Sequence, residues 1–120
     1  MDIGKTLFAK NREQWRRWLA KNHLKEHDIW LIFHKKNRKK KIETEGVSFN
    51  DALEEALCFG WIDSLVKTLD ESRYVQRFSP RKGKSFLSEI NRELVKKLIK
   101  SKKMTPYGLE SIKHHLENGN

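Results

Sequence analysis

Three charged side chains stand among aromatic ones in the middle of this sequence. Asp63 lies two residues after Trp61, and Arg77 and Arg81 lie on either side of Phe78. A buried charge that loses its partner costs about 3–5 kcal/mol, so a carboxylate and two guanidinium groups in such surroundings should pair. We therefore expect Asp63 to pair with Arg77 or Arg81. The pair is either structural, joining a strand to a loop, or part of a ligand site, and the sequence leaves both interpretations open.

The chemistry that these residues favour is the binding of an anion. Arg81 opens a short basic loop that precedes an expected helix. Backbone amides at a helix start, together with nearby cations, attract negative charge. The glycine spacing of the loop differs from that of a P-loop. The candidate ligand-binding residues are Trp61, Asp63, Arg77, Arg81, Lys84 and Ser85.

Catalytic and metal-binding chemistry is not indicated by the residue types and spacings. Cys58 is expected near the C-terminal end of a helix, where the dipole disfavours a thiolate, so it is interpreted as a small core residue. We name no catalytic residue, no metal site and no cofactor, and we expect a non-enzymatic binding protein. The histidines have no metal-ligand spacing with the cysteine; they are His23, His27, His34, His114 and His115.

A run of cations supports an alternative function. A compact fold cannot bury such a run, so it should form a solvated loop or hairpin tip. The formal net charge is +10, and a basic run suits contacts to phosphates that do not read sequence. Nucleic-acid binding through this run and the basic loop is the alternative, and a steep loss of affinity with added salt would identify it. The cations of the run are Lys35, Lys36, Arg38, Lys39, Lys40 and Lys41.

The hydrophobic pattern predicts three strands that position the candidate site. Residues 28–34 are apolar on both faces, which predicts a central strand covered on both sides. Residues 61–67 and 74–78 alternate and are joined by a polar turn, which predicts a β-hairpin that carries Asp63 and Arg77. Residues 1–10 predict a short strand or an ordered arm.

Capping residues mark four expected helices. Asn11 and Ser48 each begin a capping-box pattern, and Gly60 supplies the C-terminal stop of the second helix. The third helix is expected to be capped by Ser85 or Ser88, and the fourth by Thr105. The apolar faces of the first, third and fourth helices are expected to include Trp15, Trp18, Leu19 and Leu24, then Leu87, Ile90, Leu94, Val95, Leu98 and Ile99, and finally Leu109, Ile112 and Leu116.

These elements predict an α+β fold: a small sheet of three or more strands, including a β-hairpin, packed against several helices. The strand order is left open. The length of 120 residues indicates one domain, residues 1–120, because a chain of this size buries one core. Only 37% of the residues are hydrophobic, but four Trp, six Phe and two Tyr provide large side chains for that core.

The sequence also predicts where the protein works. A single cysteine excludes an internal disulfide framework and fits a reducing compartment. The charged N-terminal residues lack the pattern of a signal peptide, and no apolar run approaches the roughly 20 residues that span a bilayer. We expect a cytoplasmic protein without a membrane span, whose partner is an anionic ligand or an acidic protein, and we make no prediction of its oligomeric state.

Several blocks in register resemble the YdeI/OmpD-associated family of bacterial proteins. They are Trp30–Lys36 (WLIFHKK), Ala56–Asp63 (ALCFGWID), Tyr74–Arg81 (YVQRFSPR), Lys84–Ser85, Ile90–Asn91 and Met104–Leu109 (MTPYGL). The resemblance implies a stress-protection role, against bacteriocins or cationic peptides, and association with an outer-membrane porin. It implies no established biochemical activity.

Two departures from that family pattern are visible. The family has a tryptophan shortly after the Lys-Ser pair, where this sequence reads Phe86-Leu87-Ser88. Many members also continue well past the block at 104–109, whereas this sequence ends at Asn120. A role that needs the longer C-terminal region is therefore not expected.

Overall fold

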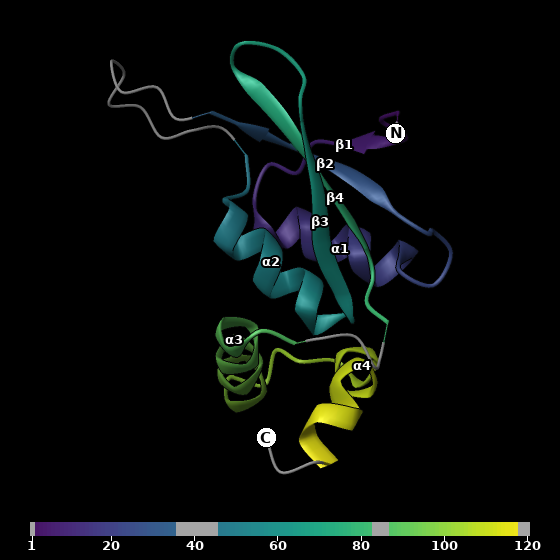
Figure 1. Ribbon diagram of the computed structural model, residues 1–120, viewed down its shortest axis with the longest axis vertical. Coiled ribbons are helices and arrows are strands. Elements are labelled where there is room, and N and C mark those ends of the chain that lie inside the picture. Colours follow the sequence, from purple (N-terminus) through teal and green to yellow (C-terminus); the bar gives the residue numbers. More distant parts are fainter. Residues whose placement is uncertain (1, 36–45, 83–86, 118–120) are drawn as a thin grey trace.

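The computed structural model describes residues 2–35, 46–82 and 87–117, and within them the chain forms an α+β fold (Figure 1). The predicted order of helix, strand, helix, hairpin and two helices is confirmed, and a short N-terminal strand precedes it. The elements are β1 (Thr6–Leu7), α1 (Arg12–Asn22), β2 (Ile29–His34), α2 (Phe49–Cys58), β3 (Trp61–Thr68), β4 (Arg73–Pro80), α3 (Glu89–Lys100) and α4 (Pro106–Glu117).

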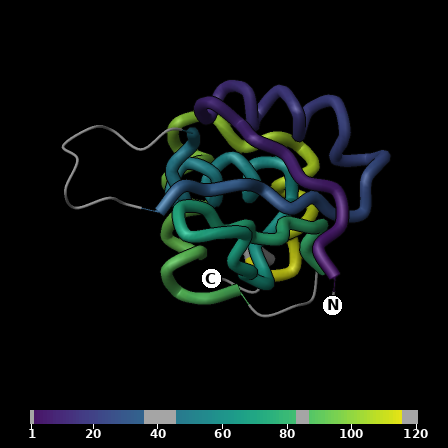
Figure 2. Tube along the Cα trace, turned by 90° about the horizontal axis from the view of Figure 1, so that it is seen from above, coloured from purple at the N-terminus to yellow at the C-terminus, as the bar shows by residue number. Residues whose placement is uncertain are grey.

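The four strands form one mixed sheet in the order β1-β2-β4-β3. β4 is antiparallel to both of its neighbours, whereas β1 is parallel to β2. The N-terminal segment accordingly runs along the edge of the sheet beside β2 (Figure 2). α2 connects β2 to β3. The second strand of the hairpin, β4, then lies between β2 and β3.

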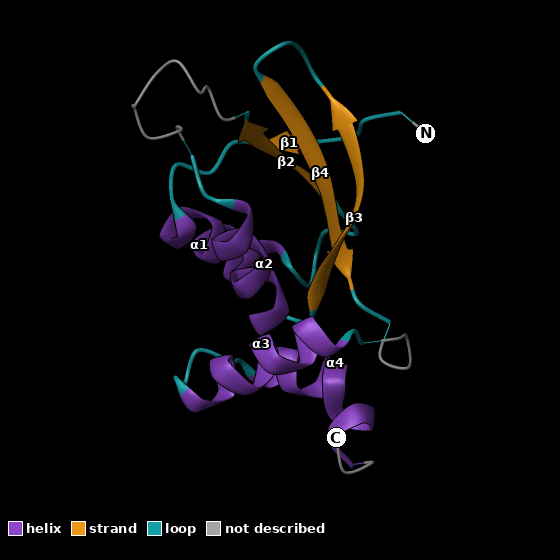
Figure 3. Ribbon diagram, turned by 60° about the vertical axis from the view of Figure 1, so that its left-hand side comes forward, coloured by secondary structure: helices purple, strands orange, loops and turns teal. Residues whose placement is uncertain are grey.

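Two helices cover one face of the sheet, and the other two lie beyond the end of the hairpin (Figure 3). Trp15 of α1 joins the layers: its indole Nε1 donates to the Ala52 carbonyl of α2 at 2.9 Å. Its ring meets Phe78 of β4 edge-on, with centroids 5.3 Å apart. Trp15 and Phe78 are both fully buried, so the predicted apolar stripe of α1 is the centre of the core.

β2 is central, as predicted, but the described helices cover only one of its faces. Leu31 faces these helices, within the core cluster. Trp30 points the other way and is still only 1% exposed. The N-terminal segment packs beside it, since a Cβ added to Gly4 would lie 3.7 Å from the indole. The prediction of cover on both sides therefore holds for Trp30, and the cover on this second face includes the N-terminal segment.

The predicted N-caps of the first two helices are confirmed. The Asn11 side chain accepts from the backbone amide of Gln14 at 3.0 Å, and the Ser48 hydroxyl accepts from that of Asp51 at 3.2 Å. Of the two candidate caps for α3, Ser88 takes this role, while Ser85 lies outside the described residues. These side chains satisfy amides that a helix start leaves without an intrahelical partner.

α4 packs directly on the turn between α2 and β3. Gly60 ends α2 with a φ of +78°, a left-handed conformation that favours glycine. The backbone amide of Thr105 donates to the Cys58 carbonyl at 3.1 Å, and its hydroxyl donates to the same oxygen. That hydroxyl also accepts from the Gly108 amide at 3.3 Å, which confirms Thr105 as the cap of α4. The last carbonyl of α2, that of Cys58, is thus partnered by the cap residue of α4.

Parts of the predicted apolar faces are exposed rather than buried. Leu24 is 72% exposed because it follows the end of α1, and Ile90 is 76% exposed in the first turn of α3. Ile99 and Leu109 are also more than one third exposed. Helical spacing selects a stripe of residues, but the neighbouring elements cover only part of its width.

Gly108 provides a test of the contact between α4 and α2. A Cβ at this position would lie 2.8 Å from the Cys58 carbonyl carbon, and closer still to its oxygen and to Met104 Sδ. Gly108→Ala should lower the free energy of unfolding by about 2–3 kcal/mol, because backbone atoms cannot yield without moving the helix. Urea denaturation followed by circular dichroism measures this value.

Gly4→Ala is the matched control, since its Cβ would make only ordinary contacts at 3.7 Å with Trp30. It should change the stability by less than about 0.5 kcal/mol. Equal effects of the two substitutions would contradict the close packing of α4 on α2.

Candidate functional site

Asp63 is bonded to an amide rather than to an arginine. Its Oδ2 accepts from Nε2 of Gln76 at 2.7 Å. Burial raises the pKa of the Asp63 carboxyl, and the bond from Gln76 offsets only part of this effect. The expected pairing of Asp63 with Arg77 or Arg81 is wrong, because each arginine bonds to other residues.

The register of the hairpin explains where Arg77 goes. Asp63 lies directly opposite Phe78, so both side chains are on the face that α1 and α2 cover. Successive side chains of a strand alternate between faces, and Arg77 is therefore on the opposite face. There its Nε donates to Asp28 at 2.8 Å. Arg77 is the neighbour of Phe78 in β4, so its side chain and that of Asp63 lie on opposite faces of the sheet.

Arg81 is buried and holds the end of β4 to α4. Its backbone amide donates to the Gly60 carbonyl at 2.8 Å. Its guanidinium donates to the Ser111 carbonyl and lies 2.9 Å from Nε2 of His115. Burial lowers the pKa of the Arg81 guanidinium, because the charged form has left water.

Trp61 and Arg81 line one open cavity of about 400 Å³, which we call the aromatic pocket. It lies where α1, the turn before β3, the end of β4 and α4 meet. Trp61 is almost fully buried and meets Trp18 of α1 edge-on at 5.7 Å. The structure thus brings together two of the six predicted ligand-binding residues. The pocket is lined by His23, Leu24, Phe59, Gly60, Trp61, Pro80, Arg81, Tyr107, Glu110 and Ser111.

His23 is one of the lining residues that the sequence reasoning missed. It is 8% exposed, its ring is 4.4 Å from that of Tyr107, and it is 5.2 Å from that of Phe59. From the sequence, the only role weighed for His23 is that of a metal ligand. The sequence does contain a signal for it. His23 follows Leu19 by one helical turn on the apolar face of α1, which places an imidazole ring next to the core.

The other predicted residues are distributed differently. Asp63 and Arg77 do not line the aromatic pocket. Lys35 of the basic run is exposed, and its amide donates to the Ser72 carbonyl at 2.7 Å. Outside the described residues lie Lys36, Arg38, Lys39, Lys40, Lys41, Lys84 and Ser85.

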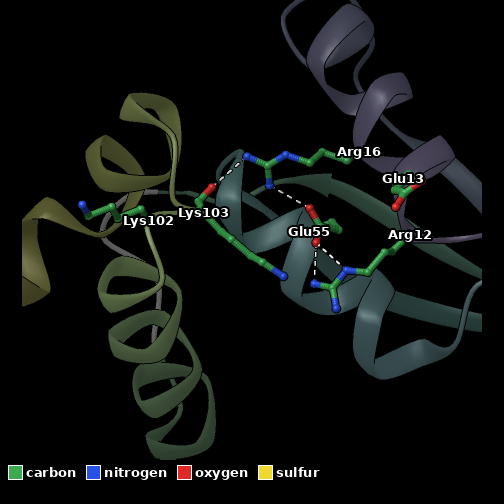
Figure 4. A pocket seen from close by; sticks show the side chains of 6 residues that line it. All are labelled: Arg12, Glu13, Arg16, Glu55, Lys102 and Lys103. Carbon is green, nitrogen blue, oxygen red and sulfur yellow. Dashed lines mark hydrogen bonds and ion pairs between the residues drawn. The ribbon is translucent and has the colours of Figure 1, made fainter.

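A second cavity, of about 300 Å³, lies beside an ion-pair cluster that was not predicted (Figure 4). Glu55 of α2 is 2% exposed. One of its carboxylate oxygens forms an ion pair with Arg12 of α1, and the other forms one with Arg16. We call this set the carboxylate cluster. Its members are Arg12, Arg16, Asp51, Glu54, Glu55 and Lys97.

We interpret the carboxylate cluster as structural, because its positive and negative charges balance. Three cations face three carboxylates, and Lys97 brings α3 into the cluster through Glu54 at 3.1 Å. Arg16 also donates at 2.8 Å to the carbonyl of Lys103, two residues after Ser101, the C-cap of α3. Lys102 lines the same cavity, but its side chain points away from Glu55 (Figure 4). The cluster therefore connects three helices, and its own charges balance.

The pKa of Glu54 agrees with this role. Burial alone would raise it, but hydrogen bonds from Arg12 and Lys97 lower it below the ordinary value of 4.5. A carboxyl with a lowered pKa in the folded state stabilises the protein above the unfolded-state value. This contribution should be lost as the pH falls below about 4.5 and through the folded-state pKa.

The described residues indicate neither a reactive thiol nor a metal site. Burial raises the pKa of the Cys58 thiol, although Arg16 acts in the opposite direction. A buried thiol with a raised pKa suits a core residue. No group of three or more histidines, cysteines or acids in the described part of the chain could hold a metal ion. Nor does any helix within residues 2–35, 46–82 and 87–117 have the length and apolarity to cross a membrane.

One family model matches most of the chain. The model of a family described as a domain of unknown function, DUF8412, matches residues 7–111. The chain belongs to this family. No curated protein and no solved structure matches it. The family match does not bear on the resemblance to YdeI/OmpD-associated proteins, which stays an interpretation of the sequence blocks.

Glu55→Gln tests the carboxylate cluster. It should lower the free energy of unfolding by about 2–3 kcal/mol, because two arginines lose their shared carboxylate while remaining able to turn toward water. Thermal or urea denaturation at pH 7 measures the loss. Glu13→Gln is the control on an exposed residue that lines the same cavity, and it should cost less than about 0.5 kcal/mol. A loss of similar size in both variants would contradict a buried cluster.

Asp63→Asn tests the position of that carboxylate. Asparagine keeps an acceptor for Gln76 and removes the partly buried charge, so the variant should be as stable as the wild type or up to about 1 kcal/mol more stable. The raised pKa sets the sign: the carboxylate costs nothing below the unfolded value of 3.8, and its cost develops as the pH rises through the folded-state pKa. The advantage of asparagine should therefore grow from pH 3 to pH 7 in denaturation curves.

Asp70→Asn should change stability in the opposite direction. Arg73 holds the pKa of Asp70 at about 2 on the surface, so asparagine loses a favourable charge interaction above that pH.

The outcome that would contradict the Asp63→Asn prediction is a loss of about 3 kcal/mol. Such a loss would restore the interpretation of Asp63 as a paired ion.

Proposed function

We propose that this protein binds a small organic anion in the aromatic pocket, where Arg81 recognises the acid group. The observation that carries the proposal is the meeting of a buried guanidinium with aromatic walls in one open cavity. Arg81 comes from the end of β4, and Trp61 comes from the start of β3. Their backbones are held together because Trp61 pairs with Pro80 and the Arg81 amide bonds to Gly60.

The state of Arg81 favours an anionic ligand. Burial lowers the pKa of its guanidinium, and an anion nearby reduces the cost of keeping that charge away from water. The bonds to Ser111 and His115 fix the guanidinium at one end of the pocket. A fixed planar guanidinium suits carboxylate and phosphate groups, which it can bind through two parallel hydrogen bonds.

The walls of the pocket define the rest of the ligand. Phe59, Trp61 and Tyr107 provide apolar and aromatic surface, which suits a planar body of low polarity. A volume of about 400 Å³ is within the range of small-molecule sites. Glu110 is exposed and lines the same pocket, so it disfavours a second negative charge. These features favour a small aromatic monoanion.

The pocket chemistry supports binding rather than a reaction. The Ser111 hydroxyl donates to the Gly108 carbonyl at 2.7 Å within α4, and so is not directed at a base. The net charge of +10 raises the local concentration of anions around the protein without selecting one. Recognition therefore rests on Arg81 and the aromatic walls.

The biological role that we propose rests on the resemblance to the YdeI/OmpD-associated family. We propose a cytoplasmic stress-protection protein in which the bound group belongs to a small anion or to an acidic protein. Nucleic-acid binding remains the alternative, and the exposed Lys35 together with the net charge supports it.

Arg81→Gln tests the proposed function, with benzoate as the probe. The variant should bind benzoate at least about tenfold more weakly, because one charge-assisted recognition of the carboxylate is lost. Titration calorimetry or 15N-HSQC titration of the full chain measures the affinity, and circular dichroism verifies that the variant is folded. Glu110→Gln should instead raise the affinity about two- to fivefold by removing a negative charge from the pocket lining.

Arg77→Gln is the matched control, since it removes an arginine from the opposite face of the sheet. It should leave the affinity for benzoate within about twofold. Equal losses in both variants would show non-specific attraction by net charge. Oligonucleotide binding that falls steeply with salt and ignores Arg81→Gln would favour the alternative function.

A further inference from the structure

The tautomer of His23 follows from one hydrogen bond. Its Nδ1 lies 2.7 Å from the Leu19 carbonyl oxygen at the end of α1. A carbonyl oxygen only accepts hydrogen bonds, so Nδ1 carries the proton that points toward Leu19. With the proton on Nδ1, the neutral ring offers a lone pair at Nε2.

That lone pair has no partner among the described residues. His23 Nε2 is buried, and no hydrogen-bonding group of the described chain reaches it. Buried polar atoms in folded proteins nearly always have a partner, so each exception calls for a physical explanation. The other buried polar groups of this pocket differ in this respect, since the Arg81 guanidinium bonds to α4.

Two rings contact His23, and they differ strongly in exposure. Phe59 is 6% exposed and belongs to the core cluster. Tyr107 is 48% exposed, lies in the first turn of α4, and contacts His23 edge-on with centroids 4.4 Å apart. Both rings line the aromatic pocket together with His23. Rotation of Tyr107 toward solvent would therefore open His23 to the pocket without disturbing the core.

We infer that the ligand of the aromatic pocket carries a hydrogen-bond donor as well as an acid group, and that His23 Nε2 accepts from this donor while Arg81 holds the acid. The ligand class is a small hydroxy- or amino-substituted aromatic acid. This inference rests on the proposed function, because it assigns a second recognition point within the same pocket. His23 selects the ligand: an acid without the donor leaves Nε2 buried and unpartnered, and so binds more weakly.

The test compares acids that differ only in the donor. The full chain is titrated with benzoate and with its 2-, 3- and 4-hydroxy derivatives and 4-aminobenzoate. At least one substituted acid should bind about tenfold more tightly than benzoate. His23→Phe keeps a planar ring in the same place and should abolish this preference, so that benzoate and its substituted derivatives bind the variant with equal affinity. Arg81→Gln should weaken every acid in the panel.

A measurement on the wild-type protein avoids dependence on the folding of His23→Phe. In long-range 1H–15N spectra of the imidazole, the Nε2 resonance of His23 should move upfield when the preferred substituted acid binds, because its lone pair accepts a hydrogen bond. Benzoate should leave this resonance in place. The signal of Tyr107 should shift with the same midpoint, since its ring must turn.

The outcomes separate the inference from the proposed function. If benzoate and all substituted acids bind equally and Arg81→Gln weakens them all, the donor inference is overturned and the anion pocket stands. If the preference persists in His23→Phe, the donor is recognised elsewhere and the inference is also overturned. If none of the acids binds the wild type, both proposals fail together.

Discussion

Burial of one face of the sheet under α1 and α2 is the constraint on which the other features of this protein depend. Trp15 contacts both layers, through its ring with Phe78 and through its indole N–H with the Ala52 carbonyl. This contact fixes the distance and the rotation of α1 relative to α2. Their polar sides then meet at Glu55, where Arg12 and Arg16 share one carboxylate. The ion pairs follow from the apolar packing, since charged pairs of this kind supply registry more readily than net stability.

The same constraint creates the aromatic pocket. Gly60 reverses the chain so that β3 begins directly beneath the end of α2, and α4 packs against this turn through Gly108. The end of β4 therefore delivers Arg81 to α4 rather than to solvent. Where these segments meet, their side chains leave the open cavity that we call the aromatic pocket. A buried cation and a buried histidine border the cavity that remains, and these two polar groups are the basis of the ligand site that we propose.

Local patterns were sufficient for the elements but not for the partners of the charged residues. The caps at Asn11 and Ser48, the stop at Gly60 and the alternation of the hairpin each depend on neighbouring residues, and the structure confirms them. The expected pairing of Asp63 failed because it depended on register. With Asp63 opposite Phe78, Arg77 is on the other face and pairs with Asp28. Asp28 is 49 residues from Arg77 in the chain, a separation that local spacing cannot anticipate.

The sequence by itself determined the α+β class, the order of the elements, the caps at Asn11, Ser48 and Thr105, and the large aromatic core, because each of these depends on short-range periodicity and side-chain size. It also selected Trp61 and Arg81, which line the aromatic pocket, together with Asp63 and Arg77, which do not. Only the tertiary structure decided the strand order, the insertion of β4 between β2 and β3, the carboxylate cluster and the place of His23. These features depend on which distant segments meet, and one residue of register exchanges every side chain between the two faces of the sheet.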